Sequence, residues 1–294
     1  MKARPFGGWN DLRAMQELCS VRLRAAPGRA VAHPGDIAWW AMPAASSPEL
    51  LAERFLLWED DDGVLDGFAA FDPDEGALAV FVAPDLADGE AAVRFEDASL
   101  AWADRGIEVA WLEFEDDVAA VGRWRARGFQ PTDRALRNLV RSLDDLPETV
   151  PDERVRAVGD ADVEDRVRIT HDAFEDLDPF PSALEVYRAF RASPAYPEGW
   201  DLLLHDDDGR AAACCLAWPD PASGASTFEP VATHPSMHGR GFGRALLTEG
   251  LRRFRAAGMT WAIVGVDVEN PAAEALYRSV GFRPDRVLRE YRRA

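Results

Sequence analysis

Residues 238–247 read His-Gly-Arg-Gly-Phe-Gly-Arg-Ala-Leu-Leu, and residues 270–277 read Asn-Pro-Ala-Ala-Glu-Ala-Leu-Tyr, with Gly281 and Phe282 shortly after. Three closely spaced glycines let the backbone turn with its N–H groups pointing one way, and the apolar residues behind them recur at helical spacing. The exposed amides at a helix N-terminus attract phosphate. The first stretch therefore predicts a loop and helix that hold a pyrophosphate.

The second stretch follows the first after one predicted strand. Residues 261–268 alternate small, apolar and β-branched side chains, as a buried strand does. Asn270 is placed to cap the helix that carries Tyr277.

In order and spacing, these residues resemble the GNAT superfamily of acetyl-CoA-dependent N-acetyltransferases. The family pattern is Val/Thr-x-Pro-x-x-Arg/Gln-x-x-Gly-x-Gly, followed by Asn-x-x-Ala-x-x-Leu-Tyr-x-x-x-Gly-Phe. One position departs from it, because His238 stands where the family usually has Arg or Gln. The matching residues are Thr233, Pro235, His238, Gly241, Gly243, Asn270, Ala273, Leu276, Tyr277, Gly281 and Phe282.

Two other nucleotide-binding classes fit poorly. Lys2 is the only lysine in the chain, so neither a P-loop NTPase motif nor a Schiff-base lysine is present. A dinucleotide fold places its glycines after the first strand of a βαβ unit, whereas here they come late in the chain.

A weak internal repeat links the two halves of the chain. Residues 123–131 parallel residues 276–284 through a shared Gly-Phe-x-Pro, which puts Asp117 opposite Asn270 and Trp124 opposite Tyr277. Further back, Val82-Ala-Pro84 parallels Thr233-His-Pro235, but the first half has no Gly-x-Gly after it. The pattern predicts a duplicated fold whose first copy has lost the cofactor loop.

The chain thus resembles tandem GNAT proteins of the mycothiol synthase type. We expect a degenerate GNAT-like domain over residues 1–146 and an acetyl-CoA-binding GNAT domain over residues 154–294. The acidic, proline-containing residues 144–153 form the predicted linker. The alternative is that the first half is an unrelated α+β domain with a chance match.

The expected fold class is α/β (α+β), with two tandem GNAT-like domains. Each domain is predicted to be a mixed, mostly antiparallel sheet flanked by helices. In the first half we expect helices at 10–25 and 90–104 and strands at 55–58, 64–71, 77–82 and 108–114. In the second half we expect helices at 160–174 and 183–191, and strands at 202–205, 211–218 and 226–233.

The resemblance implies direct transfer of an acetyl group from acetyl-CoA to an amine in a ternary complex. Tyr277 matches the tyrosine that protonates the leaving thiolate, and Glu229 lies where many members carry a base. The alternatives are that Tyr277 merely packs and that Glu229 is solvated, because the adjacent Pro230 signals a strand interruption. The residues implied in acetyl-CoA binding are Val231, Ala232, Thr233, His238, Gly239, Arg240, Gly241, Phe242, Gly243, Arg244, Asn270 and Ala273.

Charge and composition bear on partners and location. The formal net charge of −19 disfavours nucleic acid and anionic membranes and favours a small cationic amine, although acidic surface also serves solubility. The histidines and the three cysteines show no spacing for a metal, a triad or a redox pair. With no apolar run for a signal peptide or a membrane span, we expect a cytoplasmic protein. It would be a monomer of two domains or a homodimer.

Three functions remain open at this stage. The first is an N-acetyltransferase acting on a small-molecule amine. A narrower version is a mycothiol synthase-like enzyme that acylates an amino sugar conjugate. The third is a non-catalytic acyl-CoA-binding or sensor protein, because a fold does not fix a function.

Overall fold

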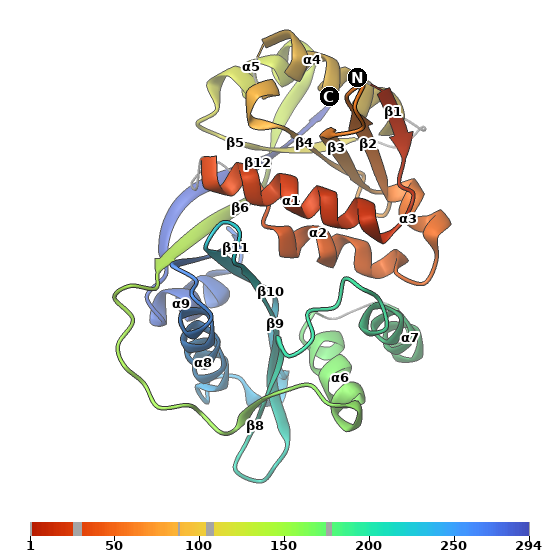
Figure 1. Ribbon diagram of the computed structural model, residues 1–294. Helices are drawn as coiled ribbons and strands as arrows, with labels where there is room; N and C mark the ends of the chain where they lie inside the picture. The colour runs from red at the N-terminus through yellow and green to blue at the C-terminus, as the bar shows by residue number, and fades with distance from the viewer. Residues whose placement is uncertain (1, 26–30, 88, 104–108, 175–177, 294) are drawn as a thin grey trace. The chain divides into compact units, whose positions relative to one another are not determined.

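The computed structural model describes residues 2–25, 31–87, 89–103, 109–174 and 178–293 (Figure 1). The chain separates into two compact units. Unit 1 consists of Met1–Asn138, Gly265–Glu269 and Pro284–Ala294, and unit 2 of Leu139–Val264 and Asn270–Arg283. The C-terminal strand is therefore part of the unit that begins at the N-terminus.

Unit 1 is a sheet with helices packed on it. Its strands lie in the order β1-β2-β3-β4-β5-β12-β6, mostly antiparallel, with β4 and β5 parallel. Its elements are β1 (Lys2–Pro5), α1 (Trp9–Ala25), α2 (Pro34–Ala41), η1 (Met42–Ala44), α3 (Pro48–Arg54), β2 (Phe55–Glu59), β3 (Leu65–Asp72), β4 (Ala77–Val82), η2 (Pro84–Leu86), α4 (Gly89–Ala103), β5 (Ala110–Phe114), α5 (Val118–Ala126), β12 (Arg283–Arg293) and the first part of β6 (Phe129–Ser142).

Unit 2 repeats this plan with the strand order β6-β11-β10-β9-β8-β7, to which β6 contributes its last residues and β11 its first. Its strands β7 to β10 are antiparallel, and β10 and β11 are parallel. Its elements are β7 (Val155–Ala157), η3 (Asp160–Asp162), α6 (Val163–Ala173), α7 (Phe180–Arg191), β8 (Asp201–His205), β9 (Ala211–Asp220), β10 (Ala225–Thr233), η4 (Pro235–Met237), α8 (Phe242–Ala256), β11 (Trp261–Asp267) and α9 (Pro271–Ser279).

Helices cover both faces of the sheet in unit 2 (Figure 1). The amphipathic helices α6 and α7 lie on one face, where Ala232 of β10 and Cys214 of β9 join their apolar residues in one core. On the other face α8 packs Phe254 against Phe228 of β10, with ring centroids 4.8 Å apart. Phe228 and Ala232 are four positions apart and would share a face in a regular strand, so their opposite orientation requires an irregularity of β10 between them.

Two helices at corresponding places begin in the same way. Asp117 caps α5 by accepting a hydrogen bond from the backbone N–H of Ala120 at 3.0 Å, and Asn270 caps α9 by accepting one from Ala273 at 3.0 Å. Both helices are nine residues long. The predicted equivalence of Asp117 and Asn270 is matched by the same local geometry, which supports the predicted duplication.

The expected architecture of mixed sheets flanked by helices is confirmed, and the predicted strands and helices correspond to elements of the structure. Several elements of the described residues escaped prediction, among them the strands β1 and β7 and the α-helices α2 and α3. Asp104 and Glu108, at the predicted ends of a helix and a strand, lie outside the described residues. The boundaries 1–146 and 154–294 stay a prediction for the repeated halves. The compact units do not divide at the linker, because unit 1 contains most of β6 and nearly all of β12.

Candidate functional site

The second half of β10 carries an irregularity where the sequence placed the candidate base. Pairing with β9 shifts register between Phe228 and Val231, so that Glu229 and Pro230 together face a single residue of β9. This is a β-bulge, which kinks a strand and re-aims its side chains. The interruption indicated by Pro230 is therefore present, but in an inner strand.

Beyond the bulge, β10 turns part of its backbone away from β9. The N–H of His234 donates to the carbonyl of Ala212 in β9, and hydrogen-bonding direction alternates along an antiparallel pair. The N–H groups of Val231 and Thr233 consequently point to the opposite side. On that side the recorded pairing with β11 covers only Ala225–Thr227, so the two strands part just before the bulge.

Glu229 is half-buried at the bulge. Its backbone carbonyl accepts a hydrogen bond from the indole Nε1 of Trp218 at 2.9 Å, which fixes the backbone at this point. The carboxylate lies close enough to Tyr277 for its negative charge to act on the phenol.

Tyr277 is buried in α9 and packs its ring edge-on against Phe282, with centroids 5.8 Å apart. Burial raises the pKa of its phenol above the ordinary value, and the charges of Glu229 and Cys215 raise it further. The structure thus brings the two predicted catalytic side chains into one electrostatic environment, although 48 positions separate them in the sequence.

The glycine loop leads from β10 into α8. Gly239 and Gly241 have φ angles of 73° and 84°, a left-handed conformation that favours glycine, and Gly241 is the residue that caps α8. His238 spans the loop, because its Nε2 donates to the carbonyl of Thr233 at 2.9 Å. The loop is exposed over residues 238–241, whereas Phe242 and Gly243 in the first turn of α8 are buried.

Gly243 serves close packing within the first turn of α8. A Cβ atom at this position would lie 3.0 Å from Oγ1 of Thr233 and 3.1 Å from Cδ2 of Leu276. A glycine here therefore lets the start of α8 approach both the end of β10 and α9. Phe242 beside it is buried and anchors the same turn.

The two loop arginines have different surroundings. The Arg240 guanidinium lies over the ring of Phe242, 4.9 Å from its centroid, and Nη1 contacts Sδ of Met237 at 2.9 Å. Arg244 is exposed and lines a cavity of about 290 Å³ beside Gly241. It also lines a larger cavity of about 690 Å³ whose wall contains Arg141, Arg252 and Arg255.

This larger cavity has four arginines in its wall and one acid, Glu148, although two of the arginines are partly neutralised. Arg141 forms an ion pair with Asp145 at 2.6 Å. Arg252 forms an ion pair with Glu249 at 2.7 Å, and Arg255 donates to the backbone carbonyl of Leu146 at 2.6 Å. Arginine side chains suit the charge and shape of phosphate groups. The cavity begins at Arg244 in α8 and follows that helix to Ala256.

Asn270 and Ala273 form the cap of α9, since the side-chain carbonyl of Asn270 accepts the N–H of Ala273. Asn270 is exposed and Ala273 half-buried. The predicted capping role of Asn270 is confirmed. Ala232 is buried on the α6 and α7 face, away from the glycine loop.

Sequence reasoning missed one polar cluster in unit 2. Nε2 of His234 lies 3.4 Å from Oδ2 of Asp172, and Nδ1 of His171 lies 3.2 Å from the other oxygen of the same carboxylate. Nδ1 of His234 also contacts Oγ of Ser236 at 2.9 Å. No spacing in the sequence signals this cluster, because His234 follows β10 while the other two residues end α6. It holds the end of β10 against that helix.

Three features of unit 2 together define a class of protein. They are a glycine loop at the start of α8, a β-bulge in β10 where this strand separates from β11, and a buried tyrosine on α9. Residues 167–282 match the acetyltransferase (GNAT) family model. The chain therefore contains a GNAT acetyltransferase domain, and all of the predicted site residues lie inside the matched segment.

Among curated proteins, the chain is similar to mycothiol acetyltransferases. It is 38% identical over 92 residues to that of Nocardiopsis dassonvillei, which covers 29% of this chain and 28% of the relative. For the Clavibacter michiganensis enzyme the identity is 35% over 103 residues, covering 35% and 33%. The chain thus matches no more than about a third of the length of these relatives.

Solved structures share the fold over nearly the whole chain. A tandem GNAT protein from the clavulanic acid biosynthesis pathway has a TM-score of 0.66 at 13% identity, covering 99% of this chain and 97% of that one. A GCN5-related N-acetyltransferase from Sphaerobacter thermophilus has a TM-score of 0.60 at 19% identity, covering 99% and 94%. At such low identity these likenesses concern the fold alone.

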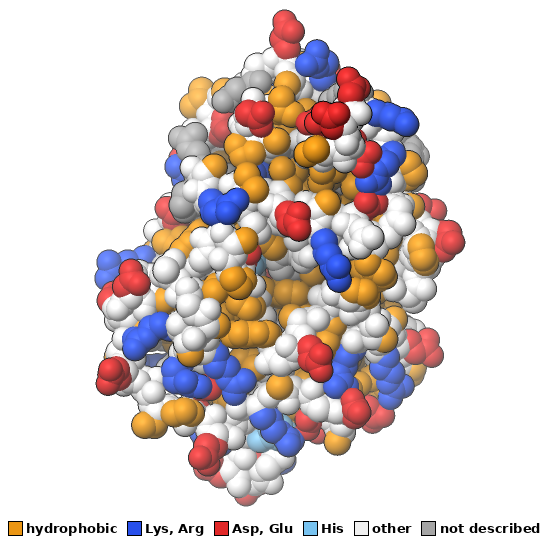
Figure 2. Space-filling model, in the orientation of Figure 1, with side chains coloured by type: hydrophobic (Ala, Val, Ile, Leu, Met, Phe, Trp, Pro, Cys, Tyr) orange, Lys and Arg blue, Asp and Glu red, His pale blue; other side chains and the backbone are white. Residues whose placement is uncertain are grey.

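Further features of the described residues bear on partners. None of their helices is long and apolar enough to cross a membrane, and they contain no cluster of His, Cys, Asp and Glu suited to a metal ion. On the face shown in Figure 2, acidic and basic side chains are interspersed rather than gathered into a basic patch.

Proposed function

We propose that this protein is an acetyl-CoA-dependent N-acetyltransferase that acts on the primary amine of a small molecule. The observation that carries the proposal is the bulge in β10 at Glu229, together with the buried Tyr277 on α9, the helix that follows the glycine loop and β11. Glu229 is a half-buried carboxylate and Tyr277 a buried phenol, which is the pairing that amide formation from a thioester needs.

Each residue has one task in the proposed reaction. Glu229 accepts a proton from the ammonium group of the acceptor, directly or through water. The freed amine nitrogen attacks the thioester carbonyl carbon, and the N–H of Val231 stabilises the oxygen as it gains negative charge. The carbon–sulfur bond then breaks, Tyr277 protonates the departing thiolate, and the nitrogen releases its second proton, which restores the Tyr277 phenol through water and leaves a neutral amide.

The loop and α8 supply the proposed donor site. Gly239 and Gly241 hold the left-handed turns that lead the exposed loop into α8, and a pyrophosphate is favoured at such a helix start. Arg244 and the basic cavity along α8 extend the positive surface from that point. His238 and Asn270 act in the proposal by fixing the loop and the start of α9, through the hydrogen bonds described above.

Unit 1 supports a single donor site. At the position that parallels Thr233, the carbonyl of Val82 accepts a hydrogen bond from Nη1 of Arg22 at 2.5 Å. The preceding Phe81 is buried against Phe68 and Trp40, with centroid distances of 4.6 and 6.0 Å. Side chains of unit 1 therefore occupy the strand surface that an acyl donor would need.

The first experiment is calorimetric titration of acetyl-CoA into the wild type and into a variant carrying both Gly241→Val and Gly243→Val. We expect a single class of site that the double substitution abolishes, followed by acetylation of members of an amine panel. A wild type that binds no acetyl-CoA would contradict the transferase proposal, and a second site would place a donor in unit 1.

A narrower candidate is acylation of an amino sugar conjugate, as in mycothiol synthase-like proteins. The curated relatives that match this chain favour it, because they are mycothiol acetyltransferases. It predicts a much higher kcat/KM for an amino sugar conjugate than for simple alkyl amines. Equal rates on both would reject the narrower candidate and leave the general one standing.

A non-catalytic acyl-CoA sensor is the alternative from another class. It predicts binding of acetyl-CoA without transfer to any amine in the panel, and no effect of Glu229→Gln on a bound acyl donor. We also propose that the protein is cytoplasmic, which cell fractionation tests. We propose that it is a monomer of two domains or a homodimer, and light scattering distinguishes these two states.

A further inference from the structure

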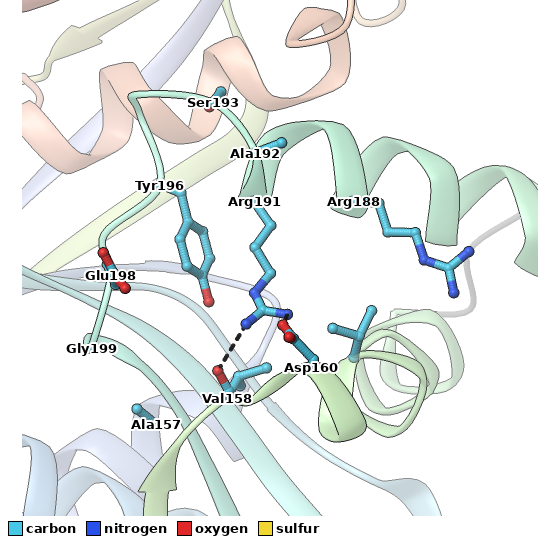
Figure 3. Close-up of a pocket in the computed structure, with 11 residues that line it drawn as sticks. Ala157, Val158, Asp160, Arg188, Arg191, Ala192, Ser193, Tyr196, Glu198 and Gly199 are labelled. Atoms are coloured by element: carbon cyan, nitrogen blue, oxygen red, sulfur yellow. Dashed lines mark hydrogen bonds and ion pairs between the residues drawn. The ribbon is translucent and has the colours of Figure 1, made fainter.

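A second cavity in unit 2 opens beside the last turn of α7. It has a volume of about 760 Å³, within the range of small-molecule sites, and lies between β7, the start of α6 and the loop after α7. Figure 3 shows Tyr196 and Arg191 in its middle, with Glu198 on one side and Arg188 on the other. The glycine loop, Glu229 and Tyr277 do not line it.

The walls of this cavity carry opposite charges in separate places. Arg188 and Arg191 lie one turn apart on α7 and present two guanidinium groups, while Glu198 and Asp160 supply carboxylates. Nη1 of Arg191 pairs with Asp160 at 2.9 Å, but the Asp160 carboxylate is fully exposed. An ion pair of this kind contributes little and exchanges readily for a better partner.

The floor of the cavity is fixed by a buried polar network. The hydroxyl of Tyr196 donates to Oδ2 of Asp201 at 3.3 Å, and the hydroxyl of Tyr187 donates to the same oxygen at 2.5 Å. Asp201 is in turn paired with the buried guanidinium of Arg166, at 3.3 Å. Tyr196 therefore links the floor of the cavity to the buried carboxylate of Asp201.

The charges select the chemistry of a ligand. Asp160 and Glu198 repel a polyanion and the two arginines repel a simple cation. The arginines already have exposed partners, because Arg191 pairs with Asp160 and Arg188 lies 3.7 Å from Glu164, and an uncharged apolar molecule would cover these groups without offering them a better partner. We propose that the cavity binds a small zwitterion, of the α-amino acid or dipeptide class. Its carboxylate would lie on Arg188 and Arg191 and its ammonium group on Glu198.

Ring contacts connect this site with the bulge in β10. The Tyr196 ring packs edge-on against Phe190, with centroids 5.6 Å apart, and Phe190 contacts Trp218 at 6.4 Å. The indole of Trp218 donates to the carbonyl of Glu229. A ligand that shifts Tyr196 would thus act on the backbone that carries the carboxylate. This regulatory effect rests on the proposed function, whereas the binding site does not.

The binding test uses calorimetry without acetyl-CoA. The probes are the common α-amino acids, glycylglycine, N-acetylglycylglycine and glycylglycinamide. We expect zwitterions to bind, and the two blocked dipeptides to bind at least about tenfold more weakly than glycylglycine. The proposal is overturned if no zwitterion binds, or if a blocked form binds as well as glycylglycine.

Substitutions place the binding within the cavity. Arg188→Gln removes an exposed charge, so we expect it to leave the fold and basal turnover unchanged and to weaken zwitterion binding about tenfold. Arg210→Gln is the matched control, because Arg210 is an exposed arginine of the β8–β9 hairpin. Equal affinities in the wild type and Arg188→Gln would assign the binding to another place, including the acceptor site, and would refute the proposal.

Hydrogen exchange measures separately whether a ligand in the cavity beside α7 affects the backbone of β10. We expect the zwitterion to change the exchange rate of the Val231 amide in the wild type. In Trp218→Phe, which keeps a ring but loses the indole N–H, this change is expected to disappear while binding remains. An unchanged Val231 rate in the liganded wild type rejects the connection, whatever the outcome of acetyltransferase assays.

Discussion

At the scale of single residues, Tyr277 has a phenol that can donate a proton and that is buried from solvent. Burial and the nearby Glu229 carboxylate keep the pKa of its phenol above the ordinary value, so the phenol stays protonated at working pH. We expect Tyr277→Phe to lower kcat by about 10²- to 10⁴-fold, the usual contribution of a general acid, with nearly unchanged calorimetric affinity for acetyl-CoA. Unchanged turnover would remove Tyr277 from the mechanism.

A second prediction concerns the effect of the Glu229 carboxylate on the pKa of Tyr277. A negative charge disfavours formation of a phenolate, so Glu229→Gln should lower the pKa of Tyr277. The measurement is a tyrosinate difference titration of the wild type and Glu229→Gln, each compared with its Tyr277→Phe counterpart. A Tyr277 titration that does not move toward lower pH would show that the two groups are not coupled.

Several residue-level features were readable from sequence and others were not. A cap needs only a side chain and an amide three residues on, so Asn270 was identified from its neighbours. The cluster of His171, Asp172 and His234 was not, because its members come from the end of α6 and the end of β10. Contacts between elements leave no periodic trace in a sequence.

At the scale of elements, the glycine loop depends on backbone conformation. Gly241 has φ of 84° with open space around its missing side chain, and Gly258 after α8 has φ of 86° with the same freedom. Alanine at either position costs about 1 kcal/mol of stability. Only Gly241→Ala should weaken acetyl-CoA binding, by about tenfold or more, because its methyl group enters the phosphate space. Calorimetry and thermal melts compare the two, and equal affinities would contradict the loop assignment.

The start of α2 holds an acid with an unusual pKa. Asp36 completes a capping box, accepting the N–H of His33 at 2.8 Å, yet burial raises its pKa to about 6. Folding then favours the protonated form, so this carboxyl stabilises at low pH and loses that contribution as pH rises from about 4 to about 6.

The substitution Asp36→Asn keeps an oxygen that can accept the N–H of His33 at the start of α2, but it removes the titrating carboxyl group. Relative to the wild type, we expect the variant to become more stable as pH rises through that window, by about 1 to 3 kcal/mol in total. Denaturant unfolding at pH 4 and pH 7 measures the difference. A gap between the two proteins that does not change with pH would show that Asp36 titrates at an ordinary value.

The longer elements were predicted because their patterns extend over several turns or strand residues. The helix 10–25 and the strand 77–82 correspond closely to α1 and β4. By contrast, β1, β7, α2 and α3 are at most eight residues long. Short elements carry too few periodic positions to be distinguished from loops, and their neighbours decide their structure.

At the scale of the whole molecule, the compact units do not follow the chain order. Tyr291 of β12 is buried in the core of unit 1 with Trp124 and Phe129, and β12 pairs with β5. We expect Tyr291→Ala to destabilise unit 1 by about 3 kcal/mol or more, with loss of amide protection in β5 by hydrogen exchange. Phe254→Ala in α8 is the matched change in unit 2 and should expose β9 instead. Loss of protection in β9 on Tyr291→Ala would contradict this division.

The sequence by itself determined the local features of this protein: the glycine loop, the caps of α5 and α9, the interruption at Pro230 and the repeated Gly-Phe-x-Pro. These depend on φ angles, on hydrogen bonds within one turn and on short periodic patterns. Only the tertiary structure decided that Glu229 acts on Tyr277, that Tyr196 lies on a buried acid and that the last strand belongs to unit 1. Such features depend on which surfaces pack together, and that is set by burial over the entire chain rather than by neighbouring residues.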